Sequence, residues 1–389
     1  MLILVLKRIL LGFITLFIVS LITFVGVEIL PGDACTTYLE RQAFGAALEA
    51  CYERLGLDIP AYERYFVWAS GVIQGDFGYS YKYYPKTPIE LIAERLPRTL
   101  MLFAMVNIVS FYTGFLVGKI LAWRRGSKSE TWITITSVFS YTVFYPWFAL
   151  MMLWFFGYKM DWLPIGKFLY PEKWYDAPFD SDVIFTLMIK FTVIVSIIQF
   201  LIYMFTRNIE SLNSKRNLRL FGLILNIVGS FIFWNTGDAL TKKIYAMDIA
   251  YHMILPVITV TIVAFAGTAL LTRTTMMEVL KDDYILTARA KGLSQRRIRD
   301  RHAARNALLP VVTSFIFTIV TIIDGSVLTE TIFSWPGMGQ LILDSVLNED
   351  IPVAMATFSF IGVFALVAHF IADISYAYLD PRIRIQSQG

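Results

Sequence analysis

Long apolar runs separated by short polar segments dominate the hydrophobic pattern of this chain. A helix needs about 20 mostly apolar residues to cross a membrane, because in hydrocarbon it must satisfy its own backbone groups. Eight runs meet this requirement, and together they predict an all-α, polytopic helical membrane protein. The runs are 9–29, 99–122, 131–157, 184–206, 220–237, 251–272, 308–329 and 354–378, of which 220–237 is the shortest.

The basic residues predict which side of the membrane each connecting segment faces. With a cytoplasmic N-terminus, the inside segments hold 20 basic and 7 acidic residues, and the outside segments hold 12 basic and 20 acidic residues. Basic residues concentrate in cytoplasmic loops, so this orientation is favoured and both termini are expected to be cytoplasmic. The predicted outside segments are 30–98, 158–183, 238–250 and 330–353.

Composition supports the membrane assignment and excludes other classes. Of the 389 residues, 57% are hydrophobic and 16% are charged, against about 45–50% and 25% in an average soluble domain. Such a chain is not intrinsically disordered. The net charge of +4 is too small to indicate a nucleic-acid partner.

The first run could belong to a cleaved signal peptide, because Lys7 and Arg8 precede it. It is longer than the usual apolar region of a signal peptide and lacks a small-x-small cleavage site, so we interpret it as an uncleaved anchor. The only two cysteines, Cys35 and Cys51, lie in the first outside segment. An oxidising compartment would permit a disulfide, but two free thiols are slightly favoured.

The predicted cytoplasmic loop 273–307 is too long and too patterned for a simple turn. A segment compatible with a helix, Tyr284 to Ala290, is followed by Lys291-Gly292, which is a C-terminal helix signal. A second such segment, Gln295 to Asn306, precedes Pro310, which is expected to open the next membrane run. Composition alone leaves open whether this basic loop only follows the positive-inside rule or docks on a partner.

Several segments occur in the order and spacing of a known family. The most specific are DDYILTARAKGL, from Asp282 to Leu293, and HAARNALLP, from His302 to Pro310. The others are LPGD (30–33), LGLDIP (55–60), GDFGYS (75–80), HMILP (252–256), LTETIFSWPGMG (328–339) and DPRIR (380–384). Together they resemble the inner-membrane permease subunits of ABC importers, in the branch that transports dipeptides, oligopeptides or nickel.

This resemblance implies the transmembrane domain of a type I ABC importer and a pore-forming permease in the inner (plasma) membrane. The implied partners are a homologous second permease, two ATP-binding subunits, an extracytoplasmic substrate-binding protein and membrane lipid. ATP and Mg would be bound by the ATP-binding subunits, so no cofactor and no catalytic residue are expected on this chain. Di- or oligopeptides are the expected cargo, while a nickel chelate or a sugar-derived cargo stays open.

The resemblance also assigns residues that couple this chain to the ATPase. They are Tyr284, Thr287, Ala288, Arg289, Ala290, Lys291, Gly292 and Leu293. Ala288 and Ala290 are expected to let the helix approach a groove on the ATPase, and Arg289 and Lys291 to pair with acidic groups around it. The general importer motif has Glu-Ala-Ala where this chain has Leu286-Thr287-Ala288, a departure that the peptide branch tolerates.

An insertion at about 183–248 is the second departure from the family pattern. It contains two of the eight apolar runs around a basic turn, so the later loop stays on the cytoplasmic side. We favour a peripheral hairpin over a role in substrate choice. The predicted organisation is an N-terminal anchor span with an extracytoplasmic segment, 1–98, and a core permease domain, 99–389, with the hairpin and the coupling loop 273–307.

Catalytic motifs are not recognisable in the sequence. Gly118-Lys119 superficially resembles the end of a phosphate-binding loop, but Thr113 stands where that motif needs glycine. The histidines are scattered and no HExxH or CxxC occurs, which argues against an intramembrane protease or a haem protein. The main alternative is a secondary transporter of small polar solutes, which would leave the patterned loop unexplained.

Asp324 and Asn107, polar groups within the predicted spans, are the candidates for the substrate pathway, and Asp324 lies deep in the seventh run. A carboxylate facing lipid costs a few kcal/mol, so Asp324 is expected to face the bundle interior, a partner or water. It could meet the cationic end of a passing peptide, or it could simply pair with Asn107 or Lys190. The second interpretation is favoured.

Overall fold

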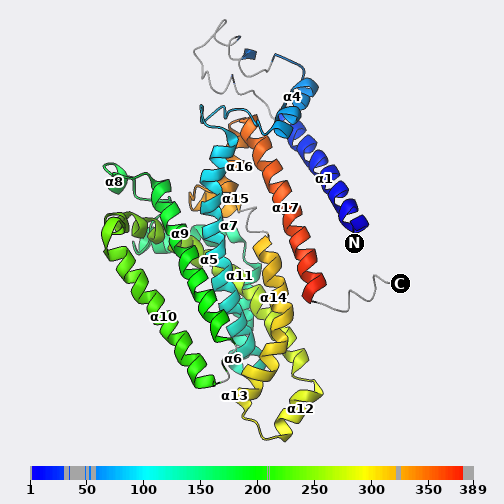
Figure 1. Ribbon diagram of the computed structural model, residues 1–389, viewed down its shortest axis with the longest axis vertical. Helices are drawn as coiled ribbons and strands as arrows, with labels where there is room; N and C mark the ends of the chain where they lie inside the picture. Colours follow the sequence, from blue (N-terminus) through cyan, green and yellow to red (C-terminus); the bar gives the residue numbers. More distant parts are fainter. Residues whose placement is uncertain are drawn as a thin grey trace. The chain divides into compact units, whose positions relative to one another are not determined.

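The computed structural model describes residues 2–29, 35, 49, 52–53, 58–207, 209, 211–320 and 326–379. Within these residues the regular elements are helices, which confirms the all-α fold (Figure 1). The chain divides into two compact units. Unit 1 comprises 1–151 and 257–389, and unit 2 comprises 152–256.

The two ends of the chain meet in unit 1. Helix α1 (Leu2–Glu28) packs along α17 (Ile351–Leu379), and α4 (Ala61–Gln74) packs against α1. Glycines allow a close approach between the two long helices, because a Cβ added to Gly362 would lie 3.0 Å from Leu16 Cδ2. The anchor that the sequence predicts is therefore packed on the core permease domain.

Helix α5 (Pro88–Trp123) crosses the predicted domain boundary at 98/99 as one continuous helix. A capping box starts it: the Thr87 side chain accepts from Glu90 N while the Glu90 side chain accepts from Thr87 N. Pro88 follows the cap, where a missing N–H costs nothing. The division into 1–98 and 99–389 stays a prediction.

Two glycines of α5 form its contact with α11 (Gly237–Val279). A Cβ added to Gly114 would lie 2.7 Å from Phe265 O, and one added to Gly118 would lie 2.4 Å from Ala269 O. Four residues apart on one helix face, the two glycines let the backbones approach closely, as small residues do in membrane helix pairs. Gly118 therefore serves helix packing and not phosphate binding.

The predicted third span, 131–157, is not one straight helix. It consists of α6 (Lys128–Thr142) and α7 (Tyr145–Met152), which continues into the π-helix η1 (Leu153–Lys159). The two halves are bent by 103° at the break between Thr142 and Tyr145. Pro146 explains the break, because it has no N–H to continue the hydrogen bonding of α6.

In its described residues, the C-terminal part of unit 1 contains four helices. They are α14 (Ala304–Val320), α15 (Val327–Ile332), α16 (Met338–Leu347) and α17. Pro310 lies inside α14, so the expectation that it opens a new run is wrong. The chain is already helical from Gln295 through α13 (Gln295–Arg297) and the π-helix η2 (Ile298–Ala303), and α14 continues this helix.

Unit 2 contains the predicted insertion. Helices α9 (Ser181–Thr206) and α10 (Leu212–Asn235) pack together as a hairpin, and α8 (Pro171–Trp174) precedes them. Asn226 Nδ2 donates to Gln199 Oε1 at 2.8 Å between the two long helices. The helix pair that the hydrophobic pattern predicts within 183–248 is therefore present.

Asp248, at 4% exposed, organises the rest of unit 2. Its carboxylate accepts from Tyr170 N at 3.0 Å, Lys173 Nζ at 3.1 Å and Trp174 Nε1 at 3.0 Å. A buried carboxylate is tolerated when it is paired and hydrogen-bonded in this way. Asp248 thus holds the segment around α8 against the first half of α11.

Four described helices are long and apolar enough to cross a membrane, or five if the bent pair counts as one span. They are Pro88–Trp123, Ser181–Thr206, Asn213–Asn235 and Gly237–Val279, with the bent pair Lys128–Thr142 and Tyr145–Lys159 as the fifth. These results support a multi-pass membrane protein, and the count of eight stays a prediction.

Cys35 is disulfide-bonded. The preference for two free thiols is therefore wrong. Cys51, the only other cysteine of the sequence, lies outside the described residues.

Candidate functional site

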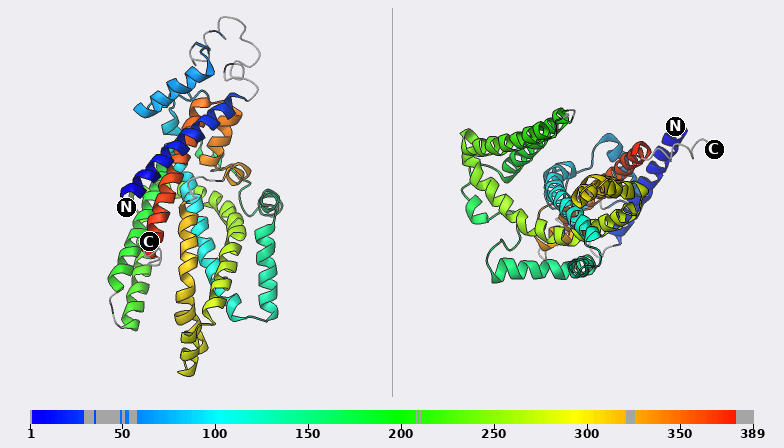
Figure 2. Two further views of the ribbon diagram at one scale, coloured as in Figure 1. Left: turned by 90° about the vertical axis from the view of Figure 1, so that its right-hand side faces the viewer. Right: turned by 90° about the horizontal axis from the view of Figure 1, so that it is seen from below.

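The candidate site is the segment from Leu280 to Ala303, here called the α12 loop, at the end of unit 1 opposite α4 (Figure 2). Helix α12 covers Asp283–Ala290 and confirms the helix that the sequence predicts. It ends at Ala290 with Lys291 as its C-cap, and Gly292 adopts the left-handed conformation with φ +73°. Glycine adopts this conformation without the steric cost of a side chain.

One face of α12 is buried in the chain's own core. Ile285 and Ala288 pack with Met276, Ile298 and Ala303, which come from α11 and η2. Ala288 is 5% exposed in the isolated chain. The expectation that Ala288 approaches a partner's groove is therefore wrong, because α11 and η2 already cover this side of the helix.

The opposite face of α12 is exposed and offers apolar and basic groups side by side. Leu286 is 56% exposed, although such a side chain is usually covered in a folded protein. Leu293 is half-buried against the core cluster. The exposed positions of the predicted set are Tyr284, Thr287, Arg289, Ala290, Lys291 and Gly292.

Polar contacts fix the α12 loop to the membrane helices. Asp300 accepts from Arg299 Nε at 2.8 Å and pairs with Lys119 Nζ of α5 at 3.1 Å. The hydrogen bond from Arg299, and then that from Lys119, hold the pKa of Asp300 well below its usual range. Asn306 Nδ2 donates to the Tyr284 hydroxyl at 2.8 Å, which ties the first turn of α12 to α14.

A second ion pair joins the start of α6 to the end of α11. Glu130 Oε1 pairs with Arg273 Nη2 at 2.5 Å, and its other oxygen accepts from Gly126 N at 2.6 Å. The start of α6 and the end of α11 are thus linked to each other and to the turn after α5, and Ala122 of α5 and Met276 of α11 pack in the same core cluster as α12. Such a platform can transmit a displacement of α12 to helices that enter the membrane.

The predicted pathway residues are not brought together within the described part. Asp324 lies outside the described residues. Asn107 is half-buried, and its Nδ2 donates to Phe103 O of its own helix at 2.9 Å. Lys190 is exposed on α9 in unit 2. The pathway role of Asp324 and Asn107 stays a prediction.

A buried polar cluster that the sequence does not reveal links α5 to the segment after α14. Glu330 is fully buried, and its carboxyl accepts from Thr99 Oγ1 at 2.7 Å and from Gln340 N at 3.0 Å. Burial raises the pKa of Glu330 to about 7 against the effect of these donors. The only sequence signal was the LTETIFSWPGMG segment, which contains Glu330 but does not indicate its contact with Thr99.

Metal chemistry finds no support in the part of the chain that the structure describes. No three His, Cys, Asp or Glu side chains among those residues lie close enough together to hold a metal ion.

Long apolar helices define the class as a polytopic helical membrane protein, and a short exposed helix projects from it on a well-anchored loop. The chain belongs to the family of binding-protein-dependent transport system inner membrane components. The model of this family matches residues 114–385, and a model of the N-terminal part of such components matches residues 1–103. The chain is thus a multi-pass inner-membrane permease of an ABC importer and works with other subunits.

Sequence similarity to three relatives extends over nearly the whole chain. The chain is 31% identical over 365 residues to the oligopeptide transport system permease protein AppB of Bacillus subtilis (strain 168), covering 94% of each chain. It is 31% identical over 373 residues to the di/tripeptide transport system permease protein DppB of Pseudomonas aeruginosa (strain UCBPP-PA14), covering 96% of each chain. It is 29% identical over 368 residues to the dipeptide transport system permease protein DppB of Escherichia coli (strain K12), covering 94% of each chain.

Proposed function

We propose that this chain is one of two pore-forming permeases in an ATP-driven importer of di- or oligopeptides. The observation that carries the proposal is its similarity, over 94% and 96% of its length, to relatives named as oligopeptide and di/tripeptide permeases. The other subunits in this proposal are a homologous permease, two ATPases that bind ATP and Mg, and an extracytoplasmic binding protein. No cofactor is assigned to this chain, and both termini are cytoplasmic.

In this proposal the exposed face of α12 docks on an ATPase. Leu286 and Ala290 supply apolar contact, while Arg289 and Lys291 pair with acidic groups. Because the inner face of α12 packs on α11 and η2, the helix moves together with the platform beneath it. ATP-driven closure of the ATPases then shifts the membrane helices between two arrangements, so that the cavity opens alternately to either side.

The test uses the whole importer, reconstituted in vesicles with its ATPases, second permease and binding protein. Leu286→Glu and Arg289→Glu place charge on the exposed face without touching the core, so we expect intact assembly of the membrane helices and loss of peptide uptake. Arg216→Glu is the matched control, because Arg216 is an exposed arginine in the turn region of the unit 2 hairpin. Its uptake should remain at the wild-type rate.

Peptide-stimulated ATP hydrolysis completes the test. A wild-type importer that moves peptide only when ATP is supplied supports the proposal. Uptake that follows an ion gradient in the absence of ATP would instead indicate a secondary transporter. If both α12 variants transport peptide at the wild-type rate, α12 is not the coupling element.

A further inference from the structure

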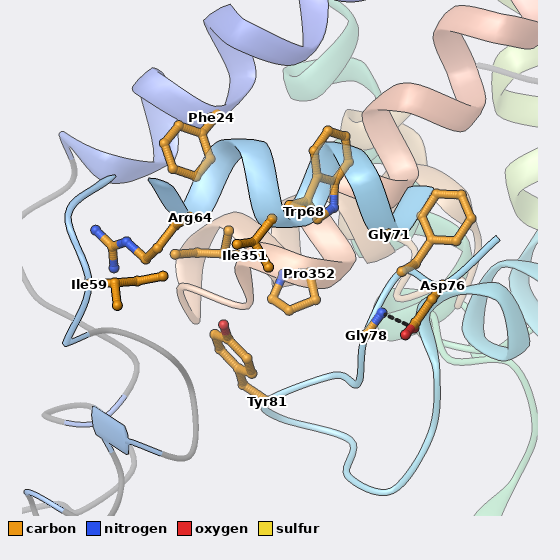
Figure 3. A pocket seen from close by; sticks show the side chains of 12 residues that line it. Phe24, Ile59, Arg64, Trp68, Gly71, Asp76, Gly78, Tyr81, Ile351 and Pro352 are labelled. Carbon is orange, nitrogen blue, oxygen red and sulfur yellow. Dashed lines mark hydrogen bonds between the residues drawn. The ribbon is translucent and has the colours of Figure 1, made fainter. Parts of the chain in front are cut away.

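A cavity of about 260 Å³ lies in unit 1 between α4, the end of α1, the segment after α4 and the first turn of α17 (Figure 3). Its apolar walls include Phe24, Trp68 and Pro352. The hydrophobic pattern places this region on the predicted extracytoplasmic side, where cargo arrives. None of the residues predicted for ATPase coupling or for the substrate pathway lines this cavity.

One face of α4 forms the length of the cavity. Arg64, Trp68 and Gly71 line it, and their spacing of four and then three residues puts them on one side of the helix. Asp76 N donates to Gly71 O at 2.9 Å, so Asp76 is fixed at the C-terminal end of α4. From Arg64 to Gly71 the helix rises roughly 10 Å.

Two buried N–H donors on the face of α4 that lines the cavity lack hydrogen-bond acceptors. Arg64 Nη2 pairs with Glu28 Oε1, but Arg64 Nε and Trp68 Nε1 are buried without a hydrogen-bond partner among the described residues. Burial raises the pKa of Tyr81, which also lines the cavity, to about 12, so its hydroxyl stays protonated. Buried donors are nearly always satisfied in proteins, so unpaired ones indicate a missing acceptor.

The opposite end of the cavity carries a carboxylate. Asp76 accepts from Gly78 N at 2.9 Å, as Figure 3 shows, and a carboxylate has capacity for further donors. Gly78 leaves space there, since nothing lies within 4 Å of a Cβ added to it, whereas a Cβ added to Gly71 would lie 2.7 Å from Asp76 O. The cavity thus has an unpaired donor on Arg64 at one end, an unpaired donor on Trp68 between the ends and an acceptor on Asp76 at the other end.

We propose that this cavity binds a short zwitterionic peptide in an extended conformation. Its terminal carboxylate accepts from Arg64 Nε, a peptide carbonyl nearer the middle accepts from the Trp68 indole N–H, its terminal ammonium donates to Asp76, and its apolar side chains pack on Phe24 and Pro352. An extended chain spans about 3.3–3.6 Å per residue, so a di- or tripeptide matches the length between the two ends. Glu28 partly neutralises Arg64, which keeps the binding weak and suits a site that must release its cargo.

This inference rests on the proposed peptide cargo and names a site for it on this chain. The test measures binding of the tripeptide Ala-Phe-Ala to the importer complex in lipid nanodiscs without the binding protein, by calorimetry. Trp68→Phe keeps the ring and removes the N–H, and Asp76→Asn removes the charge. We expect Asp76→Asn to weaken binding about tenfold and Trp68→Phe about fivefold, since hydrogen bonds to charged groups are stronger than neutral ones. Trp132→Phe and Asp238→Asn, at exposed positions, are the matched controls and should bind as wild type does.

Modified peptides assign the two ends. The C-terminal amide of Ala-Phe-Ala should bind more weakly to wild type, because it lacks the charge that faces Arg64, and should lose as much in Trp68→Phe as the free peptide does, because the carbonyl that accepts from the indole is unchanged. The N-acetyl peptide should lose little more in Asp76→Asn. Equal losses for all three peptides in Asp76→Asn, or equal affinity of the free and amidated peptides for wild type, would overturn the assignment.

Uptake and binding-protein affinity in the same preparations separate the remaining outcomes. Normal peptide import with unchanged tripeptide affinity in both variants overturns the cavity site and leaves the proposed function standing. Variants that weaken binding of the binding protein but not of the tripeptide show that the cavity seats a protein segment, which also overturns the site. A wild-type importer that moves no peptide contradicts the proposed function, and the cavity assignment falls with it.

Discussion

Thr99 donates a hydrogen bond of 2.7 Å to the buried carboxyl of Glu330, which lies 231 positions further along the chain. The same hydroxyl accepts from Met338 N at 2.7 Å. One side chain of α5 therefore holds both the short helix α15 and the start of α16. Leaving either buried partner without a hydrogen bond costs about 1–3 kcal/mol, so this contact helps to fix the segment between α14 and α17.

Titration of Glu330 should make stability depend on pH. Burial raises its folded-state pKa to about 7 from the ordinary 4.5, so the folded protein holds the proton more tightly than the unfolded chain. The resulting stabilisation, about 3 kcal/mol at most, is fully present below pH 4.5 and is lost as pH rises through 7.

Thermal unfolding in detergent should therefore show a Tm that falls over this window. Glu330→Gln should flatten the slope, while Glu172→Gln, at an exposed position of α8, should not. Equal slopes in all three proteins would contradict the prediction.

The α5–α11 contact should not tolerate a methyl group at Gly118. A Cβ there would lie 2.4 Å from Ala269 O and 2.6 Å from Thr272 Cβ, and the backbone oxygen cannot move without shifting α11. Gly118→Ala should destabilise the protein by about 1–3 kcal/mol. Gly229→Ala is the control, since nothing lies within 4 Å of the added Cβ. A Tm equal for both variants would show that the two helices separate easily.

The polar pair of the unit 2 hairpin should contribute measurably to its stability. Asn226→Leu leaves Gln199 without its donor between two apolar helices and should cost about 1 kcal/mol. The double variant Gln199→Leu/Asn226→Leu should recover most of this loss, because neither partner is then unsatisfied. The measurement is unfolding of the purified protein by SDS in mixed micelles. Simple additivity of the two single substitutions would mean that the pair is not coupled.

Cysteine labelling tests the orientation of the hairpin. Asn213→Cys should react only with reagents that reach the cytoplasm, because the turn between α9 and α10 is basic. Tyr175→Cys and Asp238→Cys should react from outside; their side chains are exposed, whereas Trp174 and Lys242 nearby are engaged with Asp248 and Asp238. Labelling of wild type sets the background. External reaction at position 213 would rule out a hairpin that crosses the membrane twice.

Sequence reasoning identified the helices well and their interruptions poorly. The apolar runs at 99–122, 184–206 and 251–272 all fall within α5, α9 and α11, because composition along one helix is a local property. The break before Tyr145 and the continuation of α14 through Pro310 were missed. A proline gives the same local sequence pattern at the start of a helix and within one. The packing of neighbouring helices decides whether the helix begins at the proline or continues through it.

The sequence by itself determined the helical class, the membrane setting, the family and the end of α12 at Gly292, because apolar run length, motif spacing and the conformational freedom of glycine are written along the chain. Only the tertiary structure decided that Ala288 faces the core while Leu286 faces outward, that Gly118 abuts α11, and that Arg64 and Asp76 mark the two ends of one cavity. In a membrane chain the lipid, the core and a partner surface are all apolar. Hydrophobicity therefore cannot show which of these three a side chain meets, and the packing of helices distant in sequence settles it.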